Sequence, residues 1–410
     1  MSYSFDLYAN PQQVDQFVDN HPNGSLLQQS SWSQIKDNWG HRIVAVTEND
    51  QIVASALVLV KKMPLGYKLY YLPRGPILDF SNHELVKFFF TELGKVAKKD
   101  KAICIKFDPL VVHDVRQPGE LTGYDTLDDT TKYLKSIGMK HHGYNLKMSE
   151  ASQPRTLAVI HFEDITQMKP KLNYYLKHAL NLGLEVTRVG REGVKTFAQL
   201  EAKTGQRKNI SLRNEDYFRK LMEVYDDQAL ITLASLNIPK AIVTAQQNLD
   251  KIRKQLERPT LSENQAKDLK IKEGVNEKNL NELLAQQKEY GDHPWVSGGL
   301  IIRSNHLAEF LYAGMDENFA AIRSNNTYYE ALKWAQENGC RICDLGGVEG
   351  TIDDGLAISK SLYQPRFESY IGEFDYPLMP LRYQLFTKAL PLARSLMYRK
   401  AQKQREKEQD

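Results

Sequence analysis

Apolar and polar residues along the first quarter of the chain predict a short run of strands and one helix. From Ile43 the stretch IVAVTENDQIVASALVLVKK predicts two strands joined by a turn at Asn49-Asp50, and YKLYYLP predicts a third strand. An amphipathic helix near 83–99 and a short apolar strand at 102–107 follow. The predicted order is therefore strand, strand, strand, helix, strand.

The same order returns in the second half of the chain. The strand-like stretches ALITLASLN, WVSGGLIIRSN and HLAEFLYAG precede the helical stretch SNNTYYEALKWAQENG and the strand CRICDLGG. Asp108 and Asp344 are each predicted to close the last strand of a copy. A helical stretch precedes each copy, and the first carries Trp32, Lys36 and Trp39 near helical spacing. The sequence therefore predicts two copies of one α/β unit.

Residues 240–291 interrupt the second copy where a hairpin turn is expected. Apolar residues from Ile242 to Leu256 step by 3, 4, 3 and 4, which is the seam of a coiled coil. Ser262 and Gln265 offer a capping box for a returning helix. An antiparallel coiled-coil arm inserted in the second unit is the prediction.

These patterns give the fold class as α/β (α+β), since 410 residues are too many for a single core. Domain 1 is predicted to comprise residues 1–150 with 373–410, where the C-terminal helix lies. Domain 2 is predicted to comprise residues 151–239 with 292–372. The arm occupies residues 240–291.

Composition and cysteine usage narrow the class of protein. Hydrophobic residues make up 41% and charged residues 26% of the chain, as in globular proteins that are not embedded in a membrane. The N-terminus lacks the basic start and apolar centre of a signal peptide, so a cytoplasmic location is expected. Cys340 and Cys343 fall on opposite faces of a predicted strand, and no metal site is expected.

The net charge is only +3, but basic residues gather at the C-terminus. Residues 381–410 contain eight Lys or Arg and three acids, with leucines at near-helical spacing. Two interpretations stay open. One is a packed terminal helix with a solvated tail, and the other is a basic surface for anionic lipid or RNA phosphate.

The order of three strands, a helix and a strand resembles the GNAT acyltransferase fold. Ordinary members of that fold hold coenzyme A with a [QR]-x-x-G-x-[GA] loop after the fourth strand, where backbone N–H groups bind the pyrophosphate. Here PLVVHDVRQPGELTG follows Asp108 and LGGVEGTIDDG follows Asp344. Both copies therefore lack the loop, which disfavours coenzyme A.

Over nearly its whole length the chain resembles the FemABX aminoacyltransferases of Gram-positive bacteria. The resemblance rests on the two GNAT-like units, the arm, LYAG before a helix, DLGG, and YIGEFDYPL with Lys360 between the last two. It implies transfer of an amino acid (Ala, Ser or Gly) from aminoacyl-tRNA to the side-chain amine of the stem peptide in a peptidoglycan precursor. That precursor is lipid II or UDP-MurNAc-pentapeptide. Since the tRNA ester is already activated, no cofactor is expected.

The resemblance also implies roles for individual residues. Lys36 and Trp39 match residues that bind the phosphate and sugar region of the precursor. Asp108 matches an acid near the acceptor peptide, where it can orient the acceptor ammonium. With an ordinary pKa of about 3.9 it is a poor base for an amine. Arg213 and Tyr217 match substrate-binding residues and, four positions apart, are expected on one helix face.

Tyr312 matches a further substrate-binding tyrosine, and Lys360 a catalytic lysine that stabilises the oxyanion formed at the ester. The chain departs from the family pattern around this lysine. Ser359 stands where an aromatic residue is usual, and Gln364-Pro365 where glycines are expected.

Structural interpretations of the same residues stay open. Asp108 can be a turn cap before Pro109, Lys36 a solvated lysine, and each tyrosine a core residue. Two other functions also stay open: a coenzyme-A-dependent GNAT N-acyltransferase and a non-catalytic scaffold that binds tRNA or a partner protein. The arm and the basic tail favour a lipid-linked acceptor and peripheral contact with the inner face of the plasma membrane.

Overall fold

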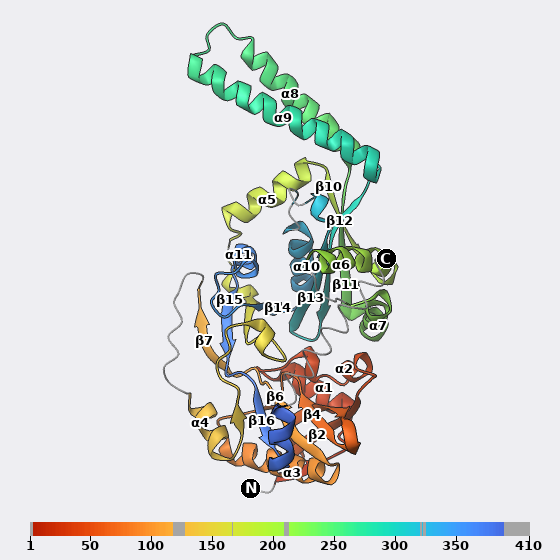
Figure 1. Cartoon of the computed structure of the whole chain (residues 1–410), viewed down its shortest axis with the longest axis vertical. Coiled ribbons are helices and arrows are strands. Elements are labelled where there is room, and N and C mark those ends of the chain that lie inside the picture. Colours follow the sequence, from red (N-terminus) through yellow and green to blue (C-terminus); the bar gives the residue numbers. More distant parts are fainter. Residues whose placement is uncertain are drawn as a thin grey trace. The chain divides into compact units, whose positions relative to one another are not determined.

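The computed structural model divides into two compact units, each built around a β-sheet (Figure 1). Unit 1 comprises Met1–Val159, Gly347–Ser359 and Arg366–Asp410, and unit 2 comprises Ile160–Gly346 and Lys360–Pro365. Within these limits the structure describes residues 3–117, 128–165, 167–208, 213–319, 322 and 325–388.

The sheet of unit 1 has the strand order β1-β2-β3-β4-β6-β16-β8, with β5 paired to β3. Its helix α3 buries Phe89 and Phe90 against the sheet. A smaller group of strands in this unit has β15 between β9 and β7. The elements are β1 (Tyr3–Asp6), α1 (Pro11–Asn20), η1 (Leu26–Gln28), α2 (Ser31–Ile35), β2 (Gly40–Glu48), β3 (Gln51–Lys62), η2 (Pro64–Gly66), β4 (Lys68–Leu72), β5 (Ile77–Leu78), α3 (His83–Lys99), β6 (Ala102–Phe107), β7 (Val112–Arg116), α4 (Asp129–Ser136), β8 (Lys140–His141), η3 (Met148–Glu150), β9 (Thr156–His161), β15 (Arg366–Tyr370) and β16 (Phe374–Pro377).

Unit 2 contains strands in the order β10-β11-β12-β13-β14. Helix α6 packs on β12 and β13, and α10 packs on β11 and β12. The elements are η4 (Phe162–Asp164), α5 (Pro170–Asn181), β10 (Leu184–Val189), η5 (Arg191–Gly193), α6 (Val194–Lys208), α7 (Glu215–Tyr225), η6 (Asp226–Gln228), β11 (Ala229–Leu236), α8 (Ile238–Leu256), α9 (Glu263–Tyr290), β12 (Trp295–Arg303), β13 (Leu307–Met315), η7 (Glu317–Phe319), α10 (Asn325–Glu337), β14 (Ile342–Val348) and η8 (Ser361–Tyr363). Helix α11 (Gly355–Lys360) belongs to unit 1 up to Ser359, and its last residue, Lys360, belongs to unit 2.

The two units repeat one plan, as the sequence predicts. In unit 1 the order is β2-β3-β4-α3-β6, and in unit 2 it is β11-β12-β13-α10-β14. In each copy the strands on either side of the helix pair in parallel, because a helical crossover returns the chain in the same direction. The predicted fold class, two α/β units with an inserted helical arm, is confirmed.

The arm consists of α8 and α9, which lie side by side and extend from unit 2 (Figure 1). The predicted capping box is present: the Ser262 hydroxyl accepts the Gln265 N–H, and the Gln265 side chain accepts the Ser262 N–H. Ala245, Leu249 and Leu283 are buried along the seam. The periodicity of apolar residues therefore identified the helix pair correctly.

Two local predictions were wrong. Helix α2 ends at Ile35, so Lys36 is its C-cap residue and Trp39 lies beyond the helix. Asp344 lies inside β14, whereas Asp108 directly follows the last residue of β6. The two aspartates therefore do not occupy equivalent positions in the repeat.

No helix within the described ranges is long and apolar enough to cross a membrane. The chain is helical over 380–388, and the remaining basic tail, 389–410, lies outside the described residues.

Candidate functional site

Asp108 is buried at the end of β6 and is held by two hydrogen bonds. Its Oδ2 accepts the Tyr71 hydroxyl at 2.7 Å, and its Oδ1 accepts the Arg74 backbone N–H at 2.6 Å. Burial raises the pKa of Asp108 to about 6, and these hydrogen bonds and the Arg74 charge only partly oppose the increase. At neutral pH the carboxyl is thus mostly ionised but far closer to protonation than an exposed aspartate.

An unusual turn brings Arg74 to the carboxylate. Arg74 has a φ of 57°, in the left-handed region that non-glycine residues rarely occupy. Its guanidinium donates to the Pro154 carbonyl at 2.9 Å. Gly75 follows, and a Cβ there would lie 2.5 Å from the Gln28 side chain, so a larger residue would displace the Gln28 amide from its hydrogen bond to the Pro73 carbonyl. The turn therefore fixes the N–H that faces Asp108.

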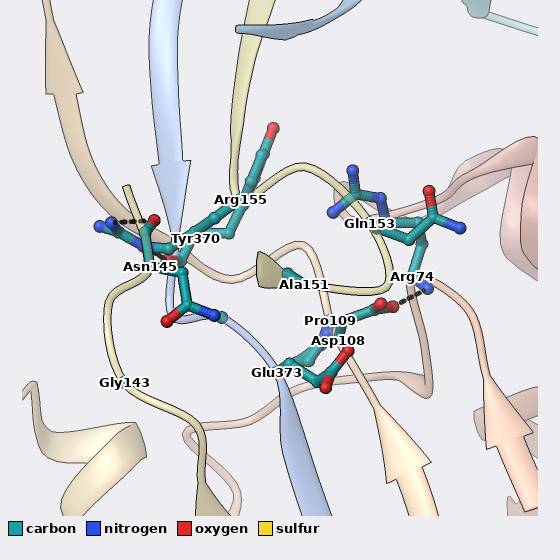
Figure 2. Close-up of a pocket in the computed structure, with 11 residues that line it drawn as sticks. Arg74, Asp108, Pro109, Gly143, Asn145, Ala151, Gln153, Arg155, Tyr370 and Glu373 are labelled. Atoms are coloured by element: carbon teal, nitrogen blue, oxygen red, sulfur yellow. Dashed lines mark hydrogen bonds between the residues drawn. The ribbon is translucent and has the colours of Figure 1, made fainter. Parts of the chain in front are cut away.

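Glu373 is a second carboxylate in the same pocket, and the sequence analysis missed it. It precedes β16, which pairs with β6 so that Phe374 lies opposite Phe107. Figure 2 shows Glu373 beside Asp108, and the negative charge of Glu373 contributes to the raised pKa of Asp108. The YIGEFDYPL motif contained this residue but gave no sign of its proximity to Asp108.

A buried lysine holds the carboxylate of Glu373. Lys106 Nζ lies 2.5 Å from Glu373 Oε1 and 3.0 Å from Asp375 Oδ1, and His142 Nε2 lies 2.8 Å from Asp375 Oδ2. Burial opposes ionisation of Glu373 and Asp375, but their partners together outweigh it and lower the pKa of each carboxyl. These partners are Lys106 and Ser152 for Glu373, and His142 and Lys106 for Asp375. Glu373 is therefore a fixed negative charge.

The pocket is lined entirely by residues of unit 1 (Figure 2). Besides the two carboxylates, Arg155 lies on it and donates to the Tyr370 carbonyl at 2.9 Å and to the Asn145 carbonyl at 3.3 Å. The Glu373 charge is already paired with Lys106, so Asp108 is the acid of this pocket that can attract an ammonium group and, when ionised, accept a proton from it. The residues that line it are Arg74, Asp108, Pro109, Gly143, Asn145, Ala151, Gln153, Arg155, Tyr370, Gly372 and Glu373.

Trp39 is connected to Asp108 through Tyr71. The Trp39 and Tyr71 rings lie 6.4 Å apart, and the Tyr71 hydroxyl donates to Asp108. Lys61 Nζ lies 5.3 Å from the Trp39 ring centroid, and Lys36 Nζ lies 5.4 Å from that of Trp32. Half-buried Trp39 and Lys36 thus lie in the same unit as the pocket, and Trp39 contacts Tyr71, the tyrosine that donates to Asp108.

The predicted residues of unit 2 form a second cluster. Tyr217 on α7 and Tyr312 on β13 share a hydrogen bond of 3.0 Å between their hydroxyls, and burial raises the pKa of Tyr217. The Arg213 guanidinium lies 4.9 Å from the Tyr217 ring centroid. The expectation that Arg213 shares a helix face with Tyr217 was wrong, because Arg213 precedes the N-cap Asn214. A cation–π contact brings the two side chains together instead.

Lys360 is buried at the end of α11. Its Nζ lies 3.6 Å from the position that a Cβ on Gly346 would occupy, and Gly346 has a φ of 86°. The Gly346 N–H donates to Asp344 Oδ1 at 2.6 Å. The ammonium therefore lies near the DLGG segment of β14. Gln364, where the family pattern has glycine, adopts a left-handed φ of 61° that glycine would also accommodate.

Among the residues that the structure describes, no group of three or more His, Cys, Asp and Glu could hold a metal ion.

Comparison with known proteins identifies the family. The FemAB family profile matches residues 10–390. The chain belongs to the FemAB family. This chain is 30% identical over 413 residues to the lipid II:glycine glycyltransferase of Staphylococcus aureus (strain USA300). The aligned region covers 94% of this chain and 96% of that relative. The same values hold for the protein of strain NCTC 8325.

A solved structure agrees with this assignment. The crystal structure of FemX is 30% identical to the FemAB chain, with a TM-score of 0.72 over 94% of this chain and 99% of that one. The resemblance drawn from DLGG and YIGEFDYPL is therefore confirmed at the level of the family.

Proposed function

We propose that this FemAB protein transfers an amino acid from aminoacyl-tRNA to the side-chain amine of the stem peptide in a peptidoglycan precursor, building the interpeptide bridge. The relative named lipid II:glycine glycyltransferase supports glycine as the amino acid and lipid II as the acceptor. UDP-MurNAc-pentapeptide is the other acceptor to test. Because aminoacyl-tRNA and the precursor would have to meet in the cytoplasm, we propose that the reaction takes place on the cytoplasmic side of the plasma membrane.

The observation that carries the proposal is the buried Asp108 carboxylate in unit 1, which lies beside Glu373, itself paired with Lys106. Asp108 is proposed to bind the acceptor ammonium, and Lys36 and Trp39 to hold the diphosphate and sugar of the precursor. With its pKa raised to about 6, Asp108 is a better proton acceptor than an aspartate at its ordinary value. The raised pKa narrows the difference from a lysine-like amine from about 6.5 to about 4.4.

The proposed chemistry is aminolysis of an ester. Asp108 takes a proton from the bound ammonium, and the neutral amine nitrogen attacks the ester carbonyl carbon. A carbon–nitrogen bond forms, the ester carbon–oxygen bond breaks, and the terminal ribose oxygen of the tRNA leaves with a proton. Lys360 is proposed to stabilise the oxyanion, and Arg213, Tyr217 and Tyr312 to bind substrate.

Transfer of radiolabelled glycine from glycyl-tRNA to lipid II tests the proposal. The wild-type protein should form labelled lipid II, and Asp108→Asn should slow transfer by about a hundredfold or more, since it removes the proton acceptor. Asp129→Asn is the matched control, because the Asp129 side chain is 97% exposed in the same unit. If Asp108→Asn transferred glycine at the wild-type rate, Asp108 would be excluded from the chemistry. Acetyl-coenzyme A as donor tests the rival acyltransferase, and product from it alone would refute the proposal.

A further inference from the structure

A hairpin of unit 1 presents a leucine to solvent at its tip. Strands β3 and β4 are joined by η2, and Leu65 in this turn is 86% exposed. Its φ is 61°, a conformation that suits Asn or Gly better than Leu. Neither packing nor backbone preference accounts for a leucine at this position.

The helical stretch 380–388 packs beside this hairpin. Tyr383 is buried in a cluster against which Met63 and Tyr67 of the hairpin and Phe386 of the helix pack. The Arg382 guanidinium lies 5.1 Å from the Tyr67 ring centroid. The hairpin and the helix thus form one continuous part of the surface of unit 1.

The other face of this helix is also apolar. Leu381 and Leu385 are four residues apart, so they lie on one side, and they are 78% and 62% exposed. Together with Leu65 they make three exposed leucines on neighbouring elements. Exposed apolar groups gathered in this way are typical of an interaction surface.

The basic residues around these leucines help to decide between RNA and a lipid bilayer as the partner. The hairpin 61–68 and the helix 380–388 contain five basic residues and no Asp or Glu. Lys68 forms an ion pair with Asp100 at 3.2 Å, and the others are Lys61, Lys62, Arg382 and Lys388. RNA would be attracted by the cations but would leave the leucines exposed. A bilayer with anionic headgroups satisfies both, since lysines pair with phosphates while leucines enter the acyl region.

We propose that this leucine surface (Leu65, Leu381 and Leu385 with Lys61, Lys62, Arg382 and Lys388) docks the protein on an anionic bilayer. The surface adjoins the acceptor residues within unit 1, because Lys61 contacts Trp39, whose ring contacts Tyr71 beside Asp108. Docking there would bring a lipid-linked precursor to the pocket while its lipid stays in the membrane. This last step rests on the proposed function, whereas the docking itself does not.

Co-sedimentation with phosphatidylcholine vesicles, with and without phosphatidylglycerol, tests the docking. The full-length wild-type protein should bind only the anionic vesicles, and high salt should weaken binding because it screens the headgroup charge. Leu65→Asn should weaken binding by about tenfold, the effect of withdrawing one leucine from an apolar phase. Asparagine suits the left-handed turn, so the melting temperature should stay the same or rise. The Lys62→Gln variant should reduce the salt dependence.

Ile271→Asn is the matched control, since Ile271 is an aliphatic residue on the arm and is 59% exposed. Its vesicle binding should equal that of the wild-type protein. Loss of binding in Ile271→Asn but not in Leu65→Asn would move the contact to the arm and overturn the inference. Binding to a single-stranded RNA oligonucleotide with none to anionic vesicles would also overturn it.

Transfer assays separate this inference from the proposed function. Leu65→Asn should slow transfer to lipid II in anionic vesicles but leave transfer to lipid II in detergent micelles unchanged, because micelles remove the docking step. Equal rates for wild-type and Leu65→Asn in vesicles would refute delivery of the acceptor by this surface. Vesicle binding as expected, with no transfer to lipid II in either medium, would refute the proposed function and leave the docking intact.

Discussion

Replacing Asp108 by Asn removes a buried charge without changing the shape of the side chain. The Asp108 carboxyl has a pKa of 3.8 in an unfolded chain and about 6 in the folded unit. Because the folded state binds the proton more tightly, the stability that this group contributes is present below pH 3.8 and is lost as the pH rises to about 6. Ionisation then costs about 3 kcal/mol at pH 7.5 and about 1 kcal/mol at pH 4.5.

Asparagine is neutral at both pH values, so the variant avoids this cost. It has one acceptor oxygen for the Arg74 N–H, and its amide must donate to the Tyr71 oxygen. This weaker pairing removes about 1 kcal/mol at either pH. Asp108→Asn should therefore stabilise unit 1 at pH 7.5 by about 2 kcal/mol more than at pH 4.5. Asp108, which we propose is needed for transfer, would thus make the folded unit less stable at pH 7.5 than asparagine does at the same position.

Hydrogen exchange of a peptide from β6 measures this difference within unit 1. In Asp108→Asn the exchange protection relative to wild type should be about thirtyfold greater at pH 7.5 than at pH 4.5. Asp129→Asn should show no such dependence because its side chain is solvated. A relative stability of Asp108→Asn that does not change with pH, or that falls between pH 4.5 and 7.5, would refute the raised pKa. The wild-type transfer rate should rise with pH through about 6 for the same reason.

Three further substitutions test other parts of the site. Lys106→Met leaves two buried carboxylates without their counter-charge and should lower the free energy of unfolding by about 3–5 kcal/mol in urea denaturation; an unchanged value would contradict the buried ion network. Tyr217→Phe removes the hydrogen bond to Tyr312 and should destabilise unit 2 by about 1 kcal/mol in thermal unfolding, and greater stability would contradict that bond. Lys360→Met should slow glycine transfer by about 10²–10³-fold with an unchanged circular dichroism spectrum, and an unchanged rate would exclude an oxyanion role.

Local signals were sufficient for most of the secondary structure. The turn between β2 and β3 falls at Asn49 and Asp50, whose φ values of 49° and 63° are those that Asn and Asp tolerate in tight hairpins. The α9 capping box and the seam of the arm follow equally from residues close in sequence. Such features depend on backbone preference and side chains a few positions apart, so the sequence determines them directly.

Residue spacing gave a wrong prediction at the start of α7, where an N-cap residue sets the first turn of the helix. Four positions separate Arg213 from Tyr217, which favours one helix face. The Asn214 side chain accepts the Tyr217 N–H at 3.1 Å, so the helix begins after Asn214 and leaves Arg213 outside it. The side chains meet through a cation–π contact that spacing alone does not predict.

The sequence by itself determined the repeated α/β plan, the arm, the family and the position of Asp108 after a buried strand. Only the tertiary structure decided which groups surround that carboxyl. β16 comes from the far end of the chain and places Glu373 beside Asp108, and the left-handed turn at Arg74 supplies the N–H. The pKa of Asp108 depends on burial and on these distant neighbours, since both act through space and not along the chain.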